Sequence, residues 1–173
     1  FNQLRHFQAG RRQAVGMTAL LDHLDDAYLR EMAGHFAALD LPYPPPPAST
    51  AAPAELARGQ ALVLHGDAQR KLPACVACHG QALTGVQPAI PGLLGLPRDY
   101  LIGQLGAWQT GLRKAHAPDC MAQVAEQLSQ ADVSAVSGWL ASQVVPHRAK
   151  PAPAPTLPLP AACGTAKAPG GRP

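Results

Sequence analysis

The sequence has few aromatic residues, few charges and no long apolar run, and each scarcity limits what the protein can be. Its 173 residues include only three Phe, two Trp and three Tyr, so a core of Ala, Leu and Val has few rings to fill it. A large bound apolar group would help to fill such a core. No apolar run approaches the ~20 residues that a membrane-spanning helix needs. The composition is that of a globular protein with room for a cofactor.

Charge gives little sign of a polyanionic partner. Charged residues make up 14% of the chain and the net charge is +3. The basic doublets are Arg11-Arg12 and Arg70-Lys71, and the other basic residues are scattered. Without a basic arm or a basic stripe with interleaved aromatics, nucleic-acid binding is excluded, and the charges indicate a solvated surface.

Proline, with 19 residues, is abundant and divides the chain. Residues 44–52 predict an extended, semi-rigid linker. Residues 146–173 predict a Pro/Ala-rich tail that cannot bury enough apolar surface to fold alone. Between them, residues 53–145 form a block of about 90 residues, which is enough for one small domain.

This block is predicted to be helical. Residues 53–65 begin with proline, carry an acidic first turn and have apolar positions at helical spacing. Residues 97–111 follow the same pattern and end at Gly111. Residues 129–143 open with a capping box from Ser129 to Asp132. No strand-like alternation stands out.

The segment before the linker repeats the end of the block. Residues 2–12 align with 103–113, and residues 17–39 align with 121–143. The aligned pairs are Gln3 with Gln104, Leu4 with Leu105, Phe7 with Trp108, Gly10 with Gly111, Arg12 with Arg113, Met17 with Met121, Leu24 with Leu128 and Ala27 with Ala131. We therefore expect residues 1–43 to be the C-terminal half of a first domain, whose first half is not in this chain.

Cys75, Cys78 and His79 form the pattern C-x-x-C-H, the sequence for covalent haem attachment. Two thiols three residues apart on one helical turn can reach the two vinyl groups of one porphyrin, and the adjacent histidine can bind the iron. A thiol redox motif would need only the two cysteines. A zinc site would need two more ligands at matching spacing, and Cys120 and Cys163 are too far apart to supply them.

A low-spin haem needs a second axial ligand, for which the residues alone leave several candidates. Met121 precedes the last predicted helix, and its repeat partner Met17 holds the same place in the other half. Met32 also belongs to the partial domain. His65 or His116 would give a bis-histidine site. We favour Met121 and expect His79 and Met121 to be the iron ligands.

The order of motifs resembles the bacterial class I cytochrome c family. "CVACHG", "AIPGLLGLPRDYLIGQLGAWQTGLR" and "CMAQVAEQLSQADVSAVSGWLASQ" carry the resemblance, which is greatest to di-haem cytochromes with two domains in tandem, the c-four-like group. It implies an all-α fold whose helices wrap a covalent haem, with a complete domain over 53–145.

The resemblance also implies further haem-binding residues. Pro91 is implied to accept the ring N–H of His79 through its carbonyl, which orients the ligand. Tyr100, Gln104, Trp108 and Arg113 are implied to line the haem edge, where Arg and Trp can bond propionates. Gly59 is implied to let the first helix cross the last one against Trp139.

One haem c is expected in this chain and a second in the intact protein. Met17 would be the axial ligand of that first haem, whose C-x-x-C-H motif is absent here. Arg12, the counterpart of Arg113, would lie beside that first haem.

Cys120 and Cys163 remain. A periplasmic compartment favours disulfides, and a bridge between them would close a loop of about 43 residues and stabilise the protein by about 4 kcal/mol. The alternatives are two unpaired thiols or pairing with another chain.

The resemblance implies a one-electron carrier of the periplasm rather than an enzyme, delivered by a signal peptide that is not in this chain. The alternative within the same chemistry is a cytochrome subunit that accepts electrons from a periplasmic dehydrogenase or feeds an oxidase. The expected partners are redox proteins: a dehydrogenase, a quinol-oxidising complex or a terminal oxidase. A weakly ligated, catalytic haem is the competing class.

Overall fold

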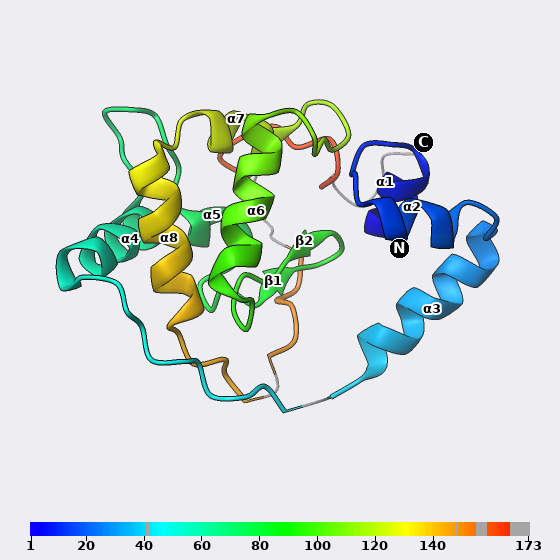
Figure 1. Cartoon of the computed structure of the whole chain (residues 1–173), viewed down its shortest axis with the longest axis horizontal. Helices are drawn as coiled ribbons and strands as arrows, with labels where there is room; N and C mark the ends of the chain where they lie inside the picture. Colours follow the sequence, from blue (N-terminus) through cyan, green and yellow to red (C-terminus); the bar gives the residue numbers. More distant parts are fainter. Residues whose placement is uncertain (41, 148, 155–158, 167–173) are drawn as a thin grey trace.

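The computed structural model describes residues 1–40, 42–147, 149–154 and 159–166 (Figure 1). The predicted tail over 146–173 therefore lies partly outside the described residues. Within them, no helix combines the length and the hydropathy that crossing a membrane requires.

The described chain is mostly helical, as predicted. Its helices are α1 (Asn2–Gln8), α2 (Val15–Leu21), α3 (Asp26–Ala38), α4 (Pro53–His65), α5 (Cys75–His79), α6 (Arg98–Gln109), α7 (Cys120–Glu126) and α8 (Gln130–Ala141). Strands β1 (Gly85–Val86) and β2 (Ile90–Pro91) form a small antiparallel sheet that the sequence did not reveal. Two-residue strands are too short to show alternation.

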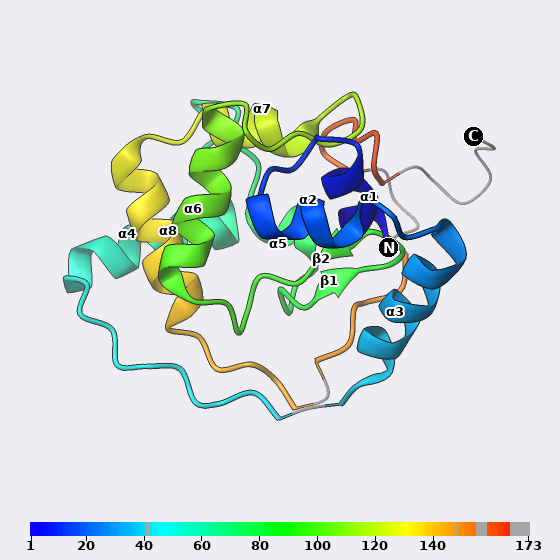
Figure 2. The same ribbon diagram turned by 45° about the vertical axis from the view of Figure 1, so that its right-hand side comes forward.

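The main core lies where α8 packs on both α4 and α6, with α5 packed on α4. Both views show α4 crossing α8, with α6 beside α8 (Figures 1 and 2). The buried residues of this core are Leu62, Val63, Leu72, Val76, Leu83, Leu101, Leu128, Val133, Val136 and Leu140. Val76 of the C-x-x-C-H motif is one of these residues and Cys75 packs against them, so the motif borders the core.

Gly59 makes the crossing of α4 and α8 possible, as expected. A Cβ added there would overlap the carbonyl oxygen of Ala135 and lie 2.9 Å from the Cβ of Trp139. The two backbones therefore approach more closely than any side chain would allow.

The start of α8 is fixed by a buried carboxylate. The predicted capping box is present, because Ser129 Oγ accepts from the Asp132 N–H while Asp132 accepts from the Ser129 N–H. Asp132 is fully buried and also accepts from Arg58 and Arg70. Burial alone would raise the pKa of Asp132, but the bonds from Arg70, Ser129 and Arg58 hold that pKa well below its ordinary value of 3.8.

The two halves of the repeat make equivalent contacts. Gln109 Nε2 donates to the carbonyls of Ala125 and Leu128, and Gln8 Nε2 donates to those of Leu21 and Leu24. Phe7 lies under the Arg12 guanidinium just as Trp108 lies under that of Arg113. The predicted linker over 44–52 contains no helix or strand. These observations are consistent with the predicted domain limits, which stay a prediction.

Candidate haem site

The haem motif occupies the short helix α5. Cys75 and Cys78 lie one turn apart, are partly buried and are not bridged to each other. His79 follows at the end of the helix. The chain thus presents two thiols and one imidazole from a single turn.

The two thiols are poorly suited to thiol redox chemistry. Burial, and next the neighbouring Cys78, raise the pKa of Cys75 to about 11. Burial also raises the pKa of Cys78. Reactive dithiols need the pKa of the attacking thiol to be lowered, because the thiolate is the nucleophile. The site therefore favours covalent attachment over disulfide exchange.

His79 is held as a neutral imidazole. It is 6% exposed, and its Nδ1 lies 2.8 Å from the carbonyl oxygen of Pro91. Burial lowers the pKa of His79, although the contact with Pro91 acts in the opposite direction. Because a carbonyl only accepts, Nδ1 carries the proton and Nε2 keeps the lone pair that a metal ligand needs.

The small sheet places the Pro91 carbonyl. Gly85 of β1 pairs with Pro91 of β2. Gly85 has φ +93°, and a Cβ there would lie 2.6 Å from the Ile90 carbonyl oxygen. Glycine is required at this turn for both reasons, so the sheet, although short, sets the orientation of His79.

The candidate second ligand lies on another element. Met121 is partly buried and is the second residue of α7, which precedes the last helix, α8. The alternatives are less suited to ligation, because His65 and His116 are both exposed. Iron ligation by Met121 stays a prediction.

A cluster of polar side chains joins the two halves of the repeat. Gln104 Oε1 accepts from Arg113 at 2.6 Å and from Arg12 at 2.9 Å. Gln3 Oε1 accepts from the same two residues at 3.2 Å each. The Tyr100 hydroxyl accepts from Arg12 at 2.8 Å. Sequence reasoning missed Gln3, although its alignment with Gln104 was the available signal.

This cluster lacks an anion. Neither Arg12 nor Arg113 forms an ion pair within the part of the chain that the structure describes. Burial, and next the nearby Arg12, lower the pKa of Arg113 to about 10, which still leaves it charged at neutral pH. Trp108 lies 3.8 Å beneath the Arg113 guanidinium, and its buried Nε1 has no partner among the described residues.

These observations fit a haem with its carboxylates. Arg12 and Arg113 share only neutral oxygen acceptors, and the buried indole N–H of Trp108 has no acceptor among the described residues. All three groups are suited to bind haem propionates. The two thiols are suited to bond to the porphyrin edge, and the lone pair of the buried imidazole is suited to bind the iron. Within the described residues, no three His, Cys, Asp or Glu side chains converge as in a simple metal site.

His6 is a buried histidine that the sequence did not single out. It is 2% exposed, its Nε2 has no partner among the described residues, and its ring centroid lies 5.2 Å from that of His116. Burial, followed by His116, lowers the pKa of His6. Nothing in its residue type or spacing predicted this burial.

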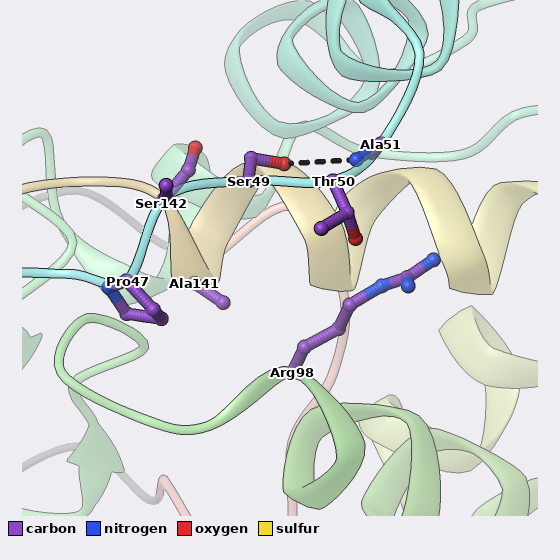
Figure 3. A pocket seen from close by; sticks show the side chains of 9 residues that line it. Pro47, Ser49, Thr50, Ala51, Arg98, Ala141 and Ser142 are labelled. Atoms are coloured by element: carbon purple, nitrogen blue, oxygen red, sulfur yellow. Dashed lines mark hydrogen bonds between the residues drawn. The ribbon is translucent and has the colours of Figure 1, made fainter.

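The pocket in Figure 3 is separate from the haem motif. It lies between the linker, Arg98 and the end of α8, and none of the candidate haem residues lines it. Arg98 is already bonded to Glu55 and Ser134 there. The pocket therefore offers no cofactor chemistry.

The structure joins Cys120 and Cys163 in a disulfide, with their Cα atoms 5.0 Å apart. The bond connects the tail to the first turn of α7, next to Met121. Both cysteines lie within the described residues.

Known proteins resemble this chain along most of its length. A thiosulfate dehydrogenase electron acceptor of Thiomonas intermedia is 34% identical over 142 residues, which cover 82% of this chain and 64% of that protein. Cytochrome c4 of Pseudomonas aeruginosa is 30% identical over 140 residues, covering 80% of this chain and 67% of that protein. The chain belongs to the cytochrome c4 family of di-haem class I c-type cytochromes. No protein-family model matches the chain.

Solved structures agree with this family. The Acidithiobacillus ferrooxidans cytochrome c4 structure superposes with a TM-score of 0.67 at 28% identity, covering 82% of this chain and 80% of that one. The thiosulfate dehydrogenase TsdBA of Marichromatium purpuratum superposes with a TM-score of 0.72 at 33% identity, covering 83% of this chain and 30% of that one. The predicted class I cytochrome c fold is thus confirmed, and the cofactor of such cytochromes is haem c.

The similarity has a defined extent. The chain spans about 64% of the length of the first relatives that it matches.

Proposed function

We propose that the protein is a one-electron carrier with a haem c attached to Cys75 and Cys78 and ligated by His79 and Met121. The observation that carries the proposal is the buried, neutral His79, whose Nδ1–H is held by Pro91 beside two protonated thiols. This arrangement suits a fixed axial ligand. When bound, the haem supplies reversible exchange of one electron between its ferric and ferrous states.

The chain's own residues set the conditions for that exchange. Pro91 orients the ring of His79. As an iron ligand, the thioether of Met121 would raise the reduction potential relative to a second histidine. The apolar core that borders α5 would lower the polarity around the haem. Arg113 would balance the charge of a propionate, and the Trp108 N–H would donate a hydrogen bond to one.

If His79 and Met121 both held the iron, as proposed, no position on it would be left for a substrate. The proposal therefore makes the protein a carrier and not an enzyme. Carbon monoxide distinguishes the two classes. Slow, weak binding to the reduced protein is expected, whereas rapid and tight binding would support a catalytic haem.

We further propose that the electron donor is a dehydrogenase of the periplasm. Two relatives are described as electron acceptors of thiosulfate dehydrogenase, and one structural neighbour is a thiosulfate dehydrogenase. A quinol-oxidising complex as donor and a terminal oxidase as acceptor are the other expected partners. Covalent haem attachment favours the periplasm.

The donor is tested by mixing the oxidised holoprotein with purified thiosulfate dehydrogenase and following haem absorbance. Reduction that requires both enzyme and thiosulfate is expected. Reduction at the rate of an enzyme-free control would contradict this donor, and the carrier function would still be tested by carbon monoxide binding.

A further inference from the structure

The described parts of the tail contact the rest of the chain at several places, including bonds from Lys150 Nζ to the carbonyls of Ala37 and Leu39. Two of these anchors lie on elements that support a candidate axial ligand. The first anchor is Ala152. Its N–H donates to the Gly85 carbonyl at 2.9 Å, and its carbonyl accepts from the Gln87 N–H at 2.8 Å. Ala152 thus adds a parallel bridge to β1. Because β1 pairs with β2, this anchor supports the strand whose Pro91 orients His79.

The second anchor lies beside Met121. Cys163 is bonded to Cys120, the first residue of α7. The Gly164 N–H donates to the Pro118 carbonyl at 2.8 Å, and Thr165 Oγ1 accepts from the His116 N–H at 3.3 Å. A Cβ on Gly164 would overlap the Ala117 carbonyl, so this contact is close. The tail is therefore fastened to the loop and first turn that carry the proposed sulfur ligand.

Packing alone does not hold the tail at this second anchor. A cavity of about 270 Å³ lies between Pro160, Ala161 and the face of α7, and residues 71–73 line its other side. Side chains on either side of a cavity lose their contacts across it. The disulfide, with two hydrogen bonds, is thus the principal attachment.

We propose that the described tail segment 159–166 is a strap that holds Met121 in place, with Cys163 as a positioning residue for its sulfur. A helix of seven residues, such as α7, has little stability of its own, and the loop before it is largely exposed. The disulfide restricts that loop, so the thioether loses less conformational freedom when it reaches its ligating position. This inference rests on the proposed His79 and Met121 ligation.

The test is Cys163→Ser in the holoprotein. The sulfur-to-iron charge-transfer band of the ferric form is expected to weaken. The affinity for added imidazole, which competes with Met121, is expected to rise about tenfold, corresponding to about 1.4 kcal/mol. Ser134→Ala is the matched control, because it removes bonds to Glu55 and Arg98 far from the strap. It is expected to leave the band and the imidazole affinity unchanged.

A second measurement covers the case in which Cys163→Ser does not fold. Anaerobic dithiothreitol is added to the folded wild-type protein with reduced haem. The dithiol gives two electrons and two protons to the disulfide, becomes a cyclic disulfide and leaves Cys120 and Cys163 as thiols. The affinity for carbon monoxide is then expected to rise.

The outcomes separate this inference from the proposed function. If the wild-type protein shows the sulfur band but neither measurement changes when the disulfide is lost, the strap has no positioning role and the proposal is overturned. If the untreated wild-type protein lacks the band and binds carbon monoxide tightly, the His79 and Met121 ligation itself is wrong.

Discussion

Helices α3 and α8 occupy equivalent places in the repeat and yet differ in burial. In α8 seven residues are buried, and in α3 only Leu29 is. The difference is large at one aligned pair, where Leu140 is 3% exposed and its repeat partner Phe36 is 67% exposed. Helix α8 packs closely on α4, and within the described residues no helix packs comparably on α3 (Figure 1).

The local contacts of the two halves are preserved despite this difference. Gln8 and Gln109 bond the carbonyls that end the following helix in the same way. These bonds need only the segments present in both halves, whereas burial of the last helix also needs the crossing helix. The amphipathic pattern of a helix therefore determines which face it can bury. Whether that face is buried depends on the helix that packs against it.

The largest expected difference concerns Leu140 and Phe36. Leu140→Ala should lower the free energy of unfolding by about 3 kcal/mol, because it empties part of a packed core. Phe36→Ala should change it by about 0.5 kcal/mol or less, because the side chain is already in solvent. Urea unfolding of the two holoprotein variants measures both, and equal losses would contradict the comparison.

The close helix crossing gives the next contrast. Gly59→Ala should cost about 2 kcal/mol or more, because the new Cβ meets backbone of α8 that cannot move aside easily. Gly34→Ala, in the interior of α3, meets nothing within 4 Å and should stabilise by about 0.5–1 kcal/mol. Thermal melts of both variants check whether each one lowers or raises the stability. If Gly59→Ala left the melting temperature unchanged, the helix crossing would be looser than described.

A smaller effect depends on pH. The folded-state pKa of Asp132 is below its ordinary value of 3.8, so its stabilisation is complete above that value and is lost as the pH falls through the folded pKa. Asp132→Asn should cost about 2 kcal/mol at neutral pH, since its guanidinium partners are partly exposed.

The control for Asp132 is its repeat counterpart. Tyr28 is 52% exposed in α3, and Tyr28→Phe should have no such pH-dependent effect. Unfolding measured between neutral and strongly acid pH should show a shallower acid decline for Asp132→Asn than for wild type. If the stability of the two proteins fell in parallel as the pH was lowered, Asp132 would not be the source of the acid decline.

The sequence predicted the features that depend on local chemistry. Proline at the start of α4 and the Ser129–Asp132 capping box of α8 are read directly from neighbouring residues. The thiols and imidazole of α5 follow from spacing. The contacts of Arg12 and Arg113 with both glutamines could not be predicted in this way, because they join segments about a hundred residues apart. The same holds for the bridge between Ala152 and β1 and for the burial of His6, which only tertiary packing determines.

The most direct test of the account compares Met121→Ala with Met32→Ala in the holoprotein. We expect Met121→Ala to abolish the sulfur-to-iron charge-transfer band and to lower the reduction potential, because the thioether that favours ferrous iron is gone. Met32→Ala, which alters a partly buried residue of α3, should leave both unchanged. An unchanged band and potential in Met121→Ala would contradict a haem ligated by His79 and Met121.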